Sequence, residues 1–326
     1  MPRILCTALN AETGPHFDTL KAAGFECDVV PRNLNLWNED VLTNAVQGYH
    51  GILAGSEPIT AGVIANSPDL RVICRAGVGF DAVDLPESDR RGVVVATTPG
   101  VNHHSVAEHA IAMLMALARG FPRLDQEVRR GEWTRIALPR VMGSTLGLVG
   151  LGRIGRATAT RAIGLGMTVI AADPFAAPEF VNEHGIRLVS FDQLLSESDY
   201  VSLHAPVVPE TRHMINADTI AKMKPTAVLI NTSRGPLVDE PALVDALQTG
   251  KLRAAGLDVF ETEPLPTSSP LLQLSNVILS GHVAGMDQES HDDTYAMAAD
   301  TFIQLHGGKW PAERIQNLKG VTDWKW

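Results

Sequence analysis

Three glycines between two apolar runs constrain this chain more than any other feature. Gly150, Gly152 and Gly155 follow the apolar run 146–149 and open a helical pattern, and a second apolar run ends just before Asp173. The first glycine permits a tight turn, the second lets the backbone approach a pyrophosphate, and the third lets the helix pack on the strand. This order of strand, glycine turn, helix, strand and carboxylate predicts a dinucleotide-binding unit.

The carboxylate at the end of the second apolar run indicates which dinucleotide is bound. Arg153 and Ile154 begin the helix, whose N-terminus attracts the phosphates. Asp173 is able to accept hydrogen bonds from a ribose 2′-hydroxyl group but repels a 2′-phosphate. We therefore expect the cofactor to be NAD rather than NADP.

Length and charge narrow the class of protein. A chain of 326 residues suits two domains of about 150 residues each. The formal net charge of −10 argues against nucleic acids and anionic membranes as partners, because both require basic patches. The chain begins with a strand-like run, and its longest apolar stretch, 110–118, is about half a membrane span. A cytoplasmic protein is the expectation.

The cysteines and histidines do not suggest a metal site. Cys6, Cys27 and Cys74 are odd in number, lie far apart and form no CxxC pair, so neither a disulfide framework nor a zinc site is indicated. Each is expected to be a small buried residue. The histidines His103, His104 and His109 do not share one helical face. The expectation is that no metal is bound.

Alternating strand and helix patterns predict two parallel α/β sheets. The strands expected in the first hundred residues are 4–8, 26–30, 51–54, 72–74 and 93–96. Those expected in the second series are 146–149, 169–172, 200–203, 227–231, 255–257 and 277–279. We predict that residues 1–99 and 288–326 form one domain and residues 100–287 the other. The turn 98–100 is a candidate hinge.

One predicted helix, 105–119, is apolar almost all round. A helix of that kind is buried, here between the domains or between subunits. Trp133 follows in a segment rich in arginine, and a dimer interface would bury both. We therefore expect a homodimer.

Charged side chains follow successive predicted strands, at the edge where ligands bind in open α/β sheets. Arg234 follows one strand, Asp258 and Glu263 the next, and His282 the last. Arginine offers a planar fork to a carboxylate, and histidine exchanges a proton near neutral pH. A carboxylate behind a histidine orients the ring and favours its protonated form. Together these groups suit hydride transfer at a hydroxy acid.

These blocks resemble the D-isomer-specific 2-hydroxyacid dehydrogenase family along essentially the whole chain. The four matching blocks are 150–155 with Asp173, 203–206 with Thr211, 231–243, and 256–264 with 282–285. The resemblance implies two doubly wound parallel-sheet domains, with a Rossmann nucleotide-binding domain inserted in a flavodoxin-like substrate domain. Many members have proline where this chain has Gly281, so we expect a looser but active loop there.

The resemblance also implies roles for individual residues. Arg234 is expected to bind the substrate carboxylate and carbonyl, His282 to act as acid and base, and Glu263 to be the partner of His282. Beyond the glycine block with Arg153, Ile154 and Asp173, the implied cofactor contacts are His204, Pro206, Thr211, Thr232, Ser233, Asp258 (on the nicotinamide side) and Gly285.

A second glycine turn lies in the first domain. Its glycines can aim backbone N–H groups at an anion. The resemblance implies that Gly77, Val78 and Gly79 bind the substrate carboxylate, and that Arg75 holds a phosphate as in the phosphoglycerate dehydrogenase branch. Further positive charge is expected from Arg135 and Arg140. The branch often has another arginine where this chain has Gly55, so the phosphate assignment stays open.

The sequence thus predicts an NAD-dependent D-2-hydroxyacid dehydrogenase with its active site between two domains. The small-molecule substrate is 3-phosphoglycerate or another small acid such as hydroxypyruvate or glyoxylate. A protein that binds NAD(H) without catalysis, like co-repressors of this fold, is the alternative from another class. Formate or phosphite oxidation has no support in these residues.

Overall fold

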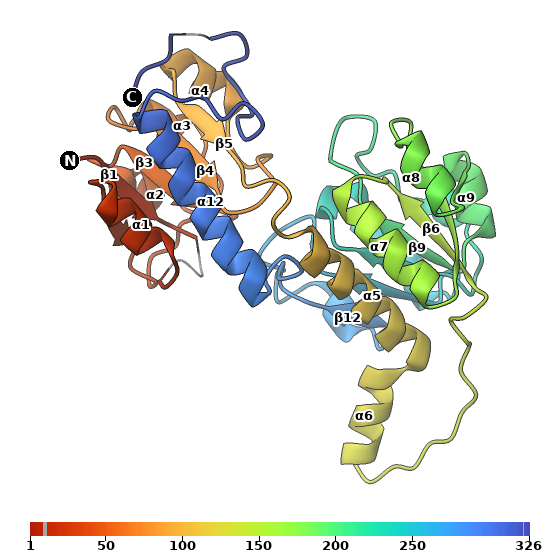
Figure 1. The fold of residues 1–326 in the computed structure, drawn as a ribbon. Coiled ribbons are helices and arrows are strands. Elements are labelled where there is room, and N and C mark those ends of the chain that lie inside the picture. The colour runs from red at the N-terminus through yellow and green to blue at the C-terminus, as the bar shows by residue number, and fades with distance from the viewer. Residues whose placement is uncertain (9–11, 322) are drawn as a thin grey trace. The chain divides into compact units, whose positions relative to one another are not determined.

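The computed structural model describes residues 1–8, 12–321 and 323–326. The chain folds as two compact units (Figure 1). The discontinuous unit consists of residues 1–102 and 287–326, and the inserted unit of residues 103–286. In the described part of the chain, no helix is long and apolar enough to cross a membrane.

The discontinuous unit is built on a five-stranded parallel sheet with strand order β2-β1-β3-β4-β5. This is the flavodoxin-like order that the resemblance implies. Its strands are β1 (Arg3–Cys6), β2 (Glu26–Val29), β3 (Gly51–Ala54), β4 (Val72–Arg75) and β5 (Val94–Ala96). Its helices are α1 (His16–Ala22), α2 (Glu39–Val46), α3 (Ala61–Ala65), α4 (Leu85–Arg91) and α12 (Gln288–His306).

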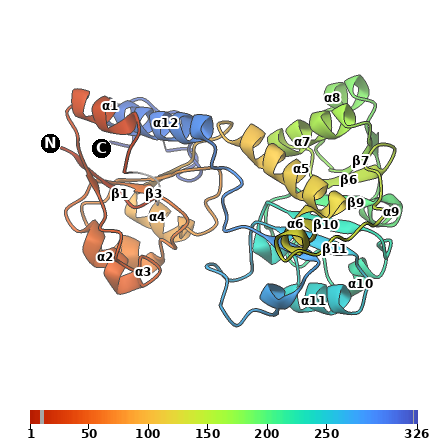
Figure 2. The same cartoon turned by 90° about the horizontal axis from the view of Figure 1, so that it is seen from below.

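Helices cover both faces of this sheet because its strands are apolar on both sides. Ile4 and Cys6 of β1 join a core under α1 and α12, while Leu5 between them joins the core under α2 and α3. Figure 2 shows these helices on opposite faces of the sheet. The return of the chain through α12 completes the unit, since Phe302 is fully buried in the first of these cores.

The inserted unit is built on a seven-stranded parallel sheet with order β12-β11-β10-β9-β6-β7-β8. The strand order reverses beside β6, which is the topological switch point where ligands bind in such sheets. Its strands are β6 (Thr145–Val149), β7 (Thr168–Ala172), β8 (Arg187–Leu188), β9 (Tyr200–Leu203), β10 (Val228–Asn231), β11 (Ala254–Leu257) and β12 (Val277–Leu279). Its helices are α5 (His103–Arg119), α6 (Phe121–Arg129), α7 (Arg153–Gly164), α8 (Pro178–Glu183), α9 (Phe191–Glu197), α10 (Ala217–Ile220) and α11 (Glu240–Gln248), with short 3₁₀ turns at Gly235–Leu237 and Pro270–Gln273.

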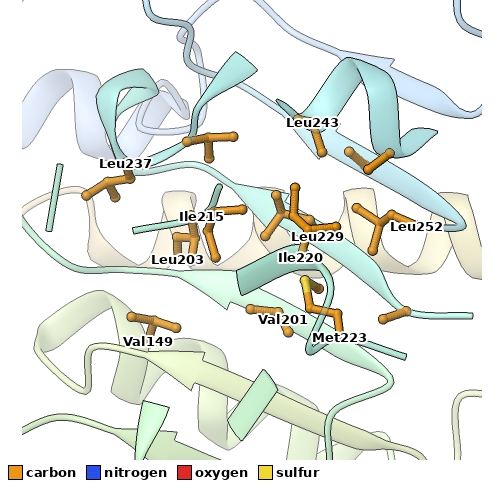
Figure 3. Close-up of a cluster of buried hydrophobic side chains, with 14 of the residues drawn as sticks. Val149, Val201, Leu203, Ile215, Ile220, Met223, Leu229, Leu237, Leu243 and Leu252 are labelled. Carbon is orange, nitrogen blue, oxygen red and sulfur yellow. The ribbon is translucent and has the colours of Figure 1, made fainter. Parts of the chain in front are cut away.

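Two cores flank this sheet. One lies under α9, α10 and α11 and includes Leu203, Leu229 and Leu243 (Figure 3). The other lies under α5 and α7. Alternate residues of every strand except β8 supply the two cores.

The expected two-sheet α/β fold is confirmed, and each expected strand is present with ends shifted by at most two residues. Strand β8 was not predicted, because Arg187 and Leu188 are both exposed and form no apolar run. The apolar helix α5 was expected to be buried between the domains or between subunits, and the structure gives it a different packing partner. Its residues Ala110, Met113 and Leu114 pack into the core of the inserted unit itself, so their burial requires no second domain or subunit.

Candidate active site

The glycine turn after β6 is built so that two of its glycines have no room for a side chain. A Cβ atom at Gly150 would lie 2.7 Å from the carbonyl oxygen of His204, and one at Gly155 would overlap the carbonyl oxygen of Gly150. Gly150 also has a φ of +96°, a conformation that favours glycine. At Gly152, by contrast, a Cβ atom would have no described heavy atom within 4 Å. The turn is therefore in close contact with neighbouring backbone at Gly150 and Gly155, and has open space beside Gly152.

Asp173 holds this turn in place from the end of β7. One carboxylate oxygen accepts a hydrogen bond from the N–H of Leu151 at 2.6 Å, and the other accepts one from the N–H of Phe175 at 2.7 Å. Gly152 is the N-cap of α7 and carries no side chain to cap it, so Arg153 and Ile154 present the helix N-terminus to a ligand. The arrangement fits a pyrophosphate with a ribose beside Asp173.

The residues after β9 and β10 form the next part of the edge. Ser233 donates from its hydroxyl to the carbonyl of Ala205 at 2.7 Å and so ties the two loops together. Thr211 donates to the carbonyl of Pro206, also at 2.7 Å, and closes the turn that contains Pro206. The expected cofactor contacts of these loops therefore lie on one braced edge.

Two buried polar atoms on this edge have no hydrogen-bond partner among the described residues. They are Nδ1 of His204 and Oγ1 of Thr232. The other ring nitrogen of His204 lies 3.0 Å from the hydroxyl oxygen of Ser202, and burial lowers the pKa of His204 to about 4. The histidine is therefore neutral. Unpartnered buried atoms are rare, and a bound dinucleotide would satisfy them.

The acid and base pair lies after β11 and β12. The Nδ1 atom of His282 lies 2.7 Å from Oε2 of Glu263, and the other carboxylate oxygen of Glu263 accepts a bond from the N–H of Phe260 at 3.0 Å. Burial opposes ionisation of Glu263, but the hydrogen bond and charge of His282 and the N–H of Phe260 hold the pKa of Glu263 below its ordinary value. The carboxylate therefore stays ionised and leaves Nε2 of a half-exposed imidazole for a substrate.

The loop that carries His282 is fixed by Asp258. The carboxylate of Asp258 is almost fully buried and accepts bonds from the N–H groups of Val283 at 3.0 Å and Ala284 at 2.9 Å. It also accepts a bond from the hydroxyl of Ser280 at 2.5 Å, and the carbonyl of Asp258 accepts one from the N–H of His282 at 2.7 Å. This network holds His282 at a φ of +56°, where a non-glycine residue is strained.

Helix α5 supports the same loop from the other side. Its Ser105 donates to the carbonyl of Ala284 at 2.8 Å, and Nε2 of its His109 lies 2.9 Å from the hydroxyl oxygen of Ser280. No role for Ser105, His109 or Ser280 was predicted from the sequence. They were missed because the contacts join segments more than 170 residues apart.

Arg234 is followed by Gly235, a position that has no room for a side chain. A Cβ atom at Gly235 would overlap the backbone of Phe260, so the loops after β10 and β11 touch at this point. This contact brings Arg234 close enough to lower the pKa of Glu263 further through its charge. The structure thus places Arg234, Glu263 and His282 together. Gly285 follows Ala284 in the same loop as His282.

The second glycine turn lies in the discontinuous unit, after β4. Gly77 has a φ of +138°, and its N–H donates to the hydroxyl oxygen of Thr98 at 2.9 Å. In the described part of the chain, the N–H groups of Val78 and Gly79 have no hydrogen-bond partner. Arg75 is buried and donates to the carbonyl of Glu57 at 2.9 Å and to that of Gly79 at 3.4 Å.

The remaining predicted arginines lie in the inserted unit, in the segment after α6. Arg135 and Arg140 are exposed, and Figure 1 shows this segment running without regular structure from α6 back to β6. Trp133 is 81 % exposed. Within the described chain, neither Arg135 nor Arg140 contacts His282 through a hydrogen bond.

Comparisons with known proteins identify the family of the chain. Residues 111–284 match the model of the D-isomer specific 2-hydroxyacid dehydrogenase, NAD binding domain. A glyoxylate reductase of Korarchaeum cryptofilum is 43 % identical over 86 % of this chain and 89 % of its own length. A D-3-phosphoglycerate dehydrogenase of Mycobacterium leprae is 44 % identical over 83 % of this chain but only 52 % of its own length, so the chain spans about half of that relative. The D-lactate dehydrogenase of Aquifex aeolicus, solved with NAD and lactic acid, has a TM-score of 0.84 at 29 % identity and covers 98 % of this chain and 99 % of its own.

Proposed function

The chain belongs to the D-isomer-specific 2-hydroxyacid dehydrogenase family, and from this premise we propose how its residues act and on which acid. It is an NAD-dependent oxidoreductase that interconverts a 2-hydroxy acid and a 2-keto acid. The observation that carries the residue roles is the bond between His282 and Glu263, which leaves one ring nitrogen of His282 for the substrate.

When bound, NAD supplies the hydride acceptor, and NADH the hydride donor. The fit of the inserted unit to this cofactor rests on the open space beside Gly152, the N-terminus of α7 and the unpartnered Thr232 hydroxyl. Asp173 would accept bonds from the ribose, and we propose a preference for NAD over NADP on that account. Equal or better kcat/KM with NADP would contradict this preference.

In reduction of a keto acid, Nε2 of His282 donates a proton to the carbonyl oxygen. The ionised Glu263 orients the ring of His282 and balances positive charge on it, and Arg234 binds the carboxylate and polarises the carbonyl. In oxidation, His282 accepts the proton of the hydroxyl group. The N–H groups of Val78 and Gly79 are proposed to bind the substrate carboxylate, since the N–H of Gly77 already donates to Thr98.

For the acid itself, we propose a small unphosphorylated 2-keto acid such as glyoxylate or hydroxypyruvate. A Cβ atom at Gly55 would lie 2.9 Å from a carboxylate oxygen of Glu57 and 3.0 Å from Cα of Ala8, so position 55 has no room for an arginine. Glu57 is buried there and accepts bonds from the N–H of Gly55 and the hydroxyl of Thr7. The carboxyl group of Glu57 occupies the space beside position 55, so the arginine of the phosphoglycerate dehydrogenase branch cannot be accommodated there.

A kinetic comparison tests this proposal. Glyoxylate or hydroxypyruvate is expected to match or exceed phosphohydroxypyruvate in kcat/KM, measured by NADH consumption. Arg75→Ala should affect all three substrates alike, because Arg75 braces the backbone of Glu57 and Gly79. A preference of tenfold or more for phosphohydroxypyruvate that Arg75→Ala removes would overturn the proposal.

3-Phosphoglycerate is the second candidate, and the identity of 44 % to a phosphoglycerate dehydrogenase favours it. Loss of a charge-assisted contact costs about 1.5–3 kcal/mol, or roughly one to two decades in rate constant. If phosphate is recognised, Arg75→Ala should therefore lower kcat/KM for the phosphorylated substrate by that factor more than for the unphosphorylated ones.

We also propose a homodimer, formed through α6 and the segment after it. Phe121 is 64 % exposed, Val128 54 % and Trp133 81 %, and α6 has no buried residue. Large apolar side chains that are this exposed are a reason to expect an interface. Light scattering at micromolar concentration should give twice the mass of one chain, and a monomer would contradict the proposal.

A further inference from the structure

Two cysteines and a histidine meet in the discontinuous unit, outside every residue assigned to the reaction. Cys6 is in β1, Cys27 is in β2, and His16 is the first residue of α1. One ligand atom from each lies within 4.8 Å of the other two. Among the described residues, no other three His, Cys, Asp or Glu side chains come together in this way.

We propose that Cys6, His16 and Cys27 bind a thiophilic d¹⁰ cation such as Zn²⁺. Thiolate sulfur and imidazole nitrogen are the ligands that this class of cation prefers. Two thiolates with a divalent cation carry no net charge, so the site meets the low polarity of its surroundings without an unpaired buried charge. Cys27 is only partly buried, which lets water reach a fourth position.

The geometry of the three ligands suits a cation. The two sulfur atoms lie 3.3 Å apart. Two sulfurs at about 2.3 Å from a tetrahedral zinc ion lie roughly 3.8 Å apart, so a small outward movement is sufficient. The ring of His16 is fully buried and stacks on Tyr295 of α12 at 4.8 Å between centroids. The histidine is thus fixed from the side of α12 while the two strands fix the sulfurs.

A disulfide between the same cysteines fits less well. In the register of β1 and β2, Cys27 pairs with Ile4 and Cys6 pairs with Val29, so the two cysteines are offset by two residues. A spacing of about 4.8 Å between strands and a rise of about 3.3 Å per residue put their Cα atoms roughly 8 Å apart. Disulfides need about 4.4–6.8 Å. The cation requires no backbone movement of that size.

Protonation connects the site to pH. Hydrogen bonding with Cys27 and burial raise the pKa of the Cys6 thiol above its ordinary value. A cation binds the thiolate forms of the two cysteines, so binding releases their protons. Affinity should rise with pH, and protons should appear in a weakly buffered solution as zinc is added.

The test is a zinc titration of the reduced, metal-stripped full chain against a chromophoric chelator. One tight zinc ion per chain is expected, and Co²⁺ in its place should give a thiolate charge-transfer band. Cys27→Ser should weaken zinc binding by at least about 100-fold, more than the 10–100-fold typical of a lost outer-shell partner. His16→Gln gives a second, independent loss.

Cys74→Ala is the matched control, because Cys74 is the third cysteine of the same unit but lies in β4, buried apart from the cluster. It should bind zinc as the unmodified chain does. Failure of the folded chain to bind zinc stoichiometrically would overturn the proposal. So would unchanged affinity in both Cys27→Ser and His16→Gln. Neither result bears on the dehydrogenase reaction, which uses none of the three residues.

Discussion

The two glycine turns of this molecule look alike in the sequence but are constrained differently. In the turn at 150–155, Gly150 and Gly155 are required by contact with neighbouring backbone, and Asp173 ties the turn to β7. In the turn at 77–79, no described atom lies within 4 Å of a Cβ position at Gly77, and only its φ of +138° requires glycine. Packing against neighbouring backbone accounts for the glycines of the first turn. In the second turn, only the backbone conformation and the proposed substrate account for them.

The same contrast extends to the charged groups. In the inserted unit, more than one hydrogen bond holds each of Glu263, His282 and Asp258. These residues are therefore fixed in place without a ligand. Preorganised groups of this kind supply transition-state stabilisation. The turn of the discontinuous unit keeps the N–H groups of Val78 and Gly79 for a ligand. Changes in the first region should therefore lower kcat, and changes in the second should raise KM.

The largest expected effect comes from the catalytic histidine. His282→Asn should lower kcat by about 10²–10⁴, the usual range for a lost acid or base. The dissociation constant of NADH should change little, because the turn at 150–155 does not contact His282 through any bond described. Stopped-flow binding and steady-state kinetics give the two quantities. Near-normal turnover would remove His282 from the mechanism.

The next effect tests whether Asp258 acts by positioning His282. In Asp258→Asn the amide N–H₂ group faces either the donors of Ser280 and Val283 or the N–H of Ala284, so at least one bond to the loop is lost. Hydrogen bonds to charged groups are worth about 1.5–3 kcal/mol, so kcat should fall roughly 10–100-fold. Ser280→Ala is the control, since it removes only a neutral hydroxyl group that contacts Asp258 and His109, leaves the carboxylate in place and should cost less.

The family resemblance assigned Asp258 to the nicotinamide side, and the two roles separate in binding. If Asp258 positions the loop, the affinity for NADH holds and kcat falls. A weaker NADH affinity with kcat preserved at saturation would support the cofactor role and contradict positioning. The pH at which activity is half lost should also move in Asp258→Asn, because the His282 loop is displaced.

How much of this site the sequence could predict follows from how far apart its parts lie. Arg234, Glu263 and His282 could be predicted because each lies in the loop that follows a strand, and the ends of parallel strands share one edge. Ser105, His109 and Gly235 could not, since their importance comes from contacts with Ala284, Ser280 and Phe260 that only the folded chain creates. The cluster of Cys6, His16 and Cys27 was missed for the same reason.

The fold divides in the same way. Strands with apolar runs on both faces were found, and the two-residue edge strand β8 was not, because exposed residues leave no pattern. Helix α5 was correctly expected to be buried, but its periodicity carries no information about which neighbour buries it. Packing partners are a property of the tertiary structure rather than of the local sequence.

Glu263→Gln sharpens the comparison through pH. The pKa of Glu263 lies below its ordinary value, so the carboxylate is charged throughout the neutral range and favours protonated His282. A neutral amide no longer does so, and His282 loses its proton at lower pH. Reduction of a keto acid needs that proton, so the high-pH limb of the rate profile should move down by at least about one pH unit. An unmoved limb would contradict the pairing.

Gly77→Ala tests the turn of the discontinuous unit. A non-glycine residue at a φ of +138° is strained by about 1–3 kcal/mol, and relief of that strain should turn the N–H groups of Val78 and Gly79. KM for the keto acid should rise roughly tenfold with kcat little changed. Gly92→Ala is a matched control, because Gly92 has a φ of +66° and equal open space in the same unit. If both variants raise KM alike, the turn has no specific role.

The smallest effect is expected at Gly281, where many members of the family have proline. The sequence suggests a looser loop there, but Asp258 and Ser105 already hold the residues on its far side. No described atom lies within 4 Å of a Cβ at Gly281, its φ is not positive, and its N–H has no hydrogen-bond partner among the described residues. Gly281→Pro should therefore fit, raise the free energy of unfolding by about 0.4–1 kcal/mol through the unfolded state, and change kcat less than about twofold. A clear rise in kcat would mean that the bonds to Asp258 do not fix the position of His282. The inserted unit would then be no better preorganised than the turn at 77–79, which would contradict the comparison made above.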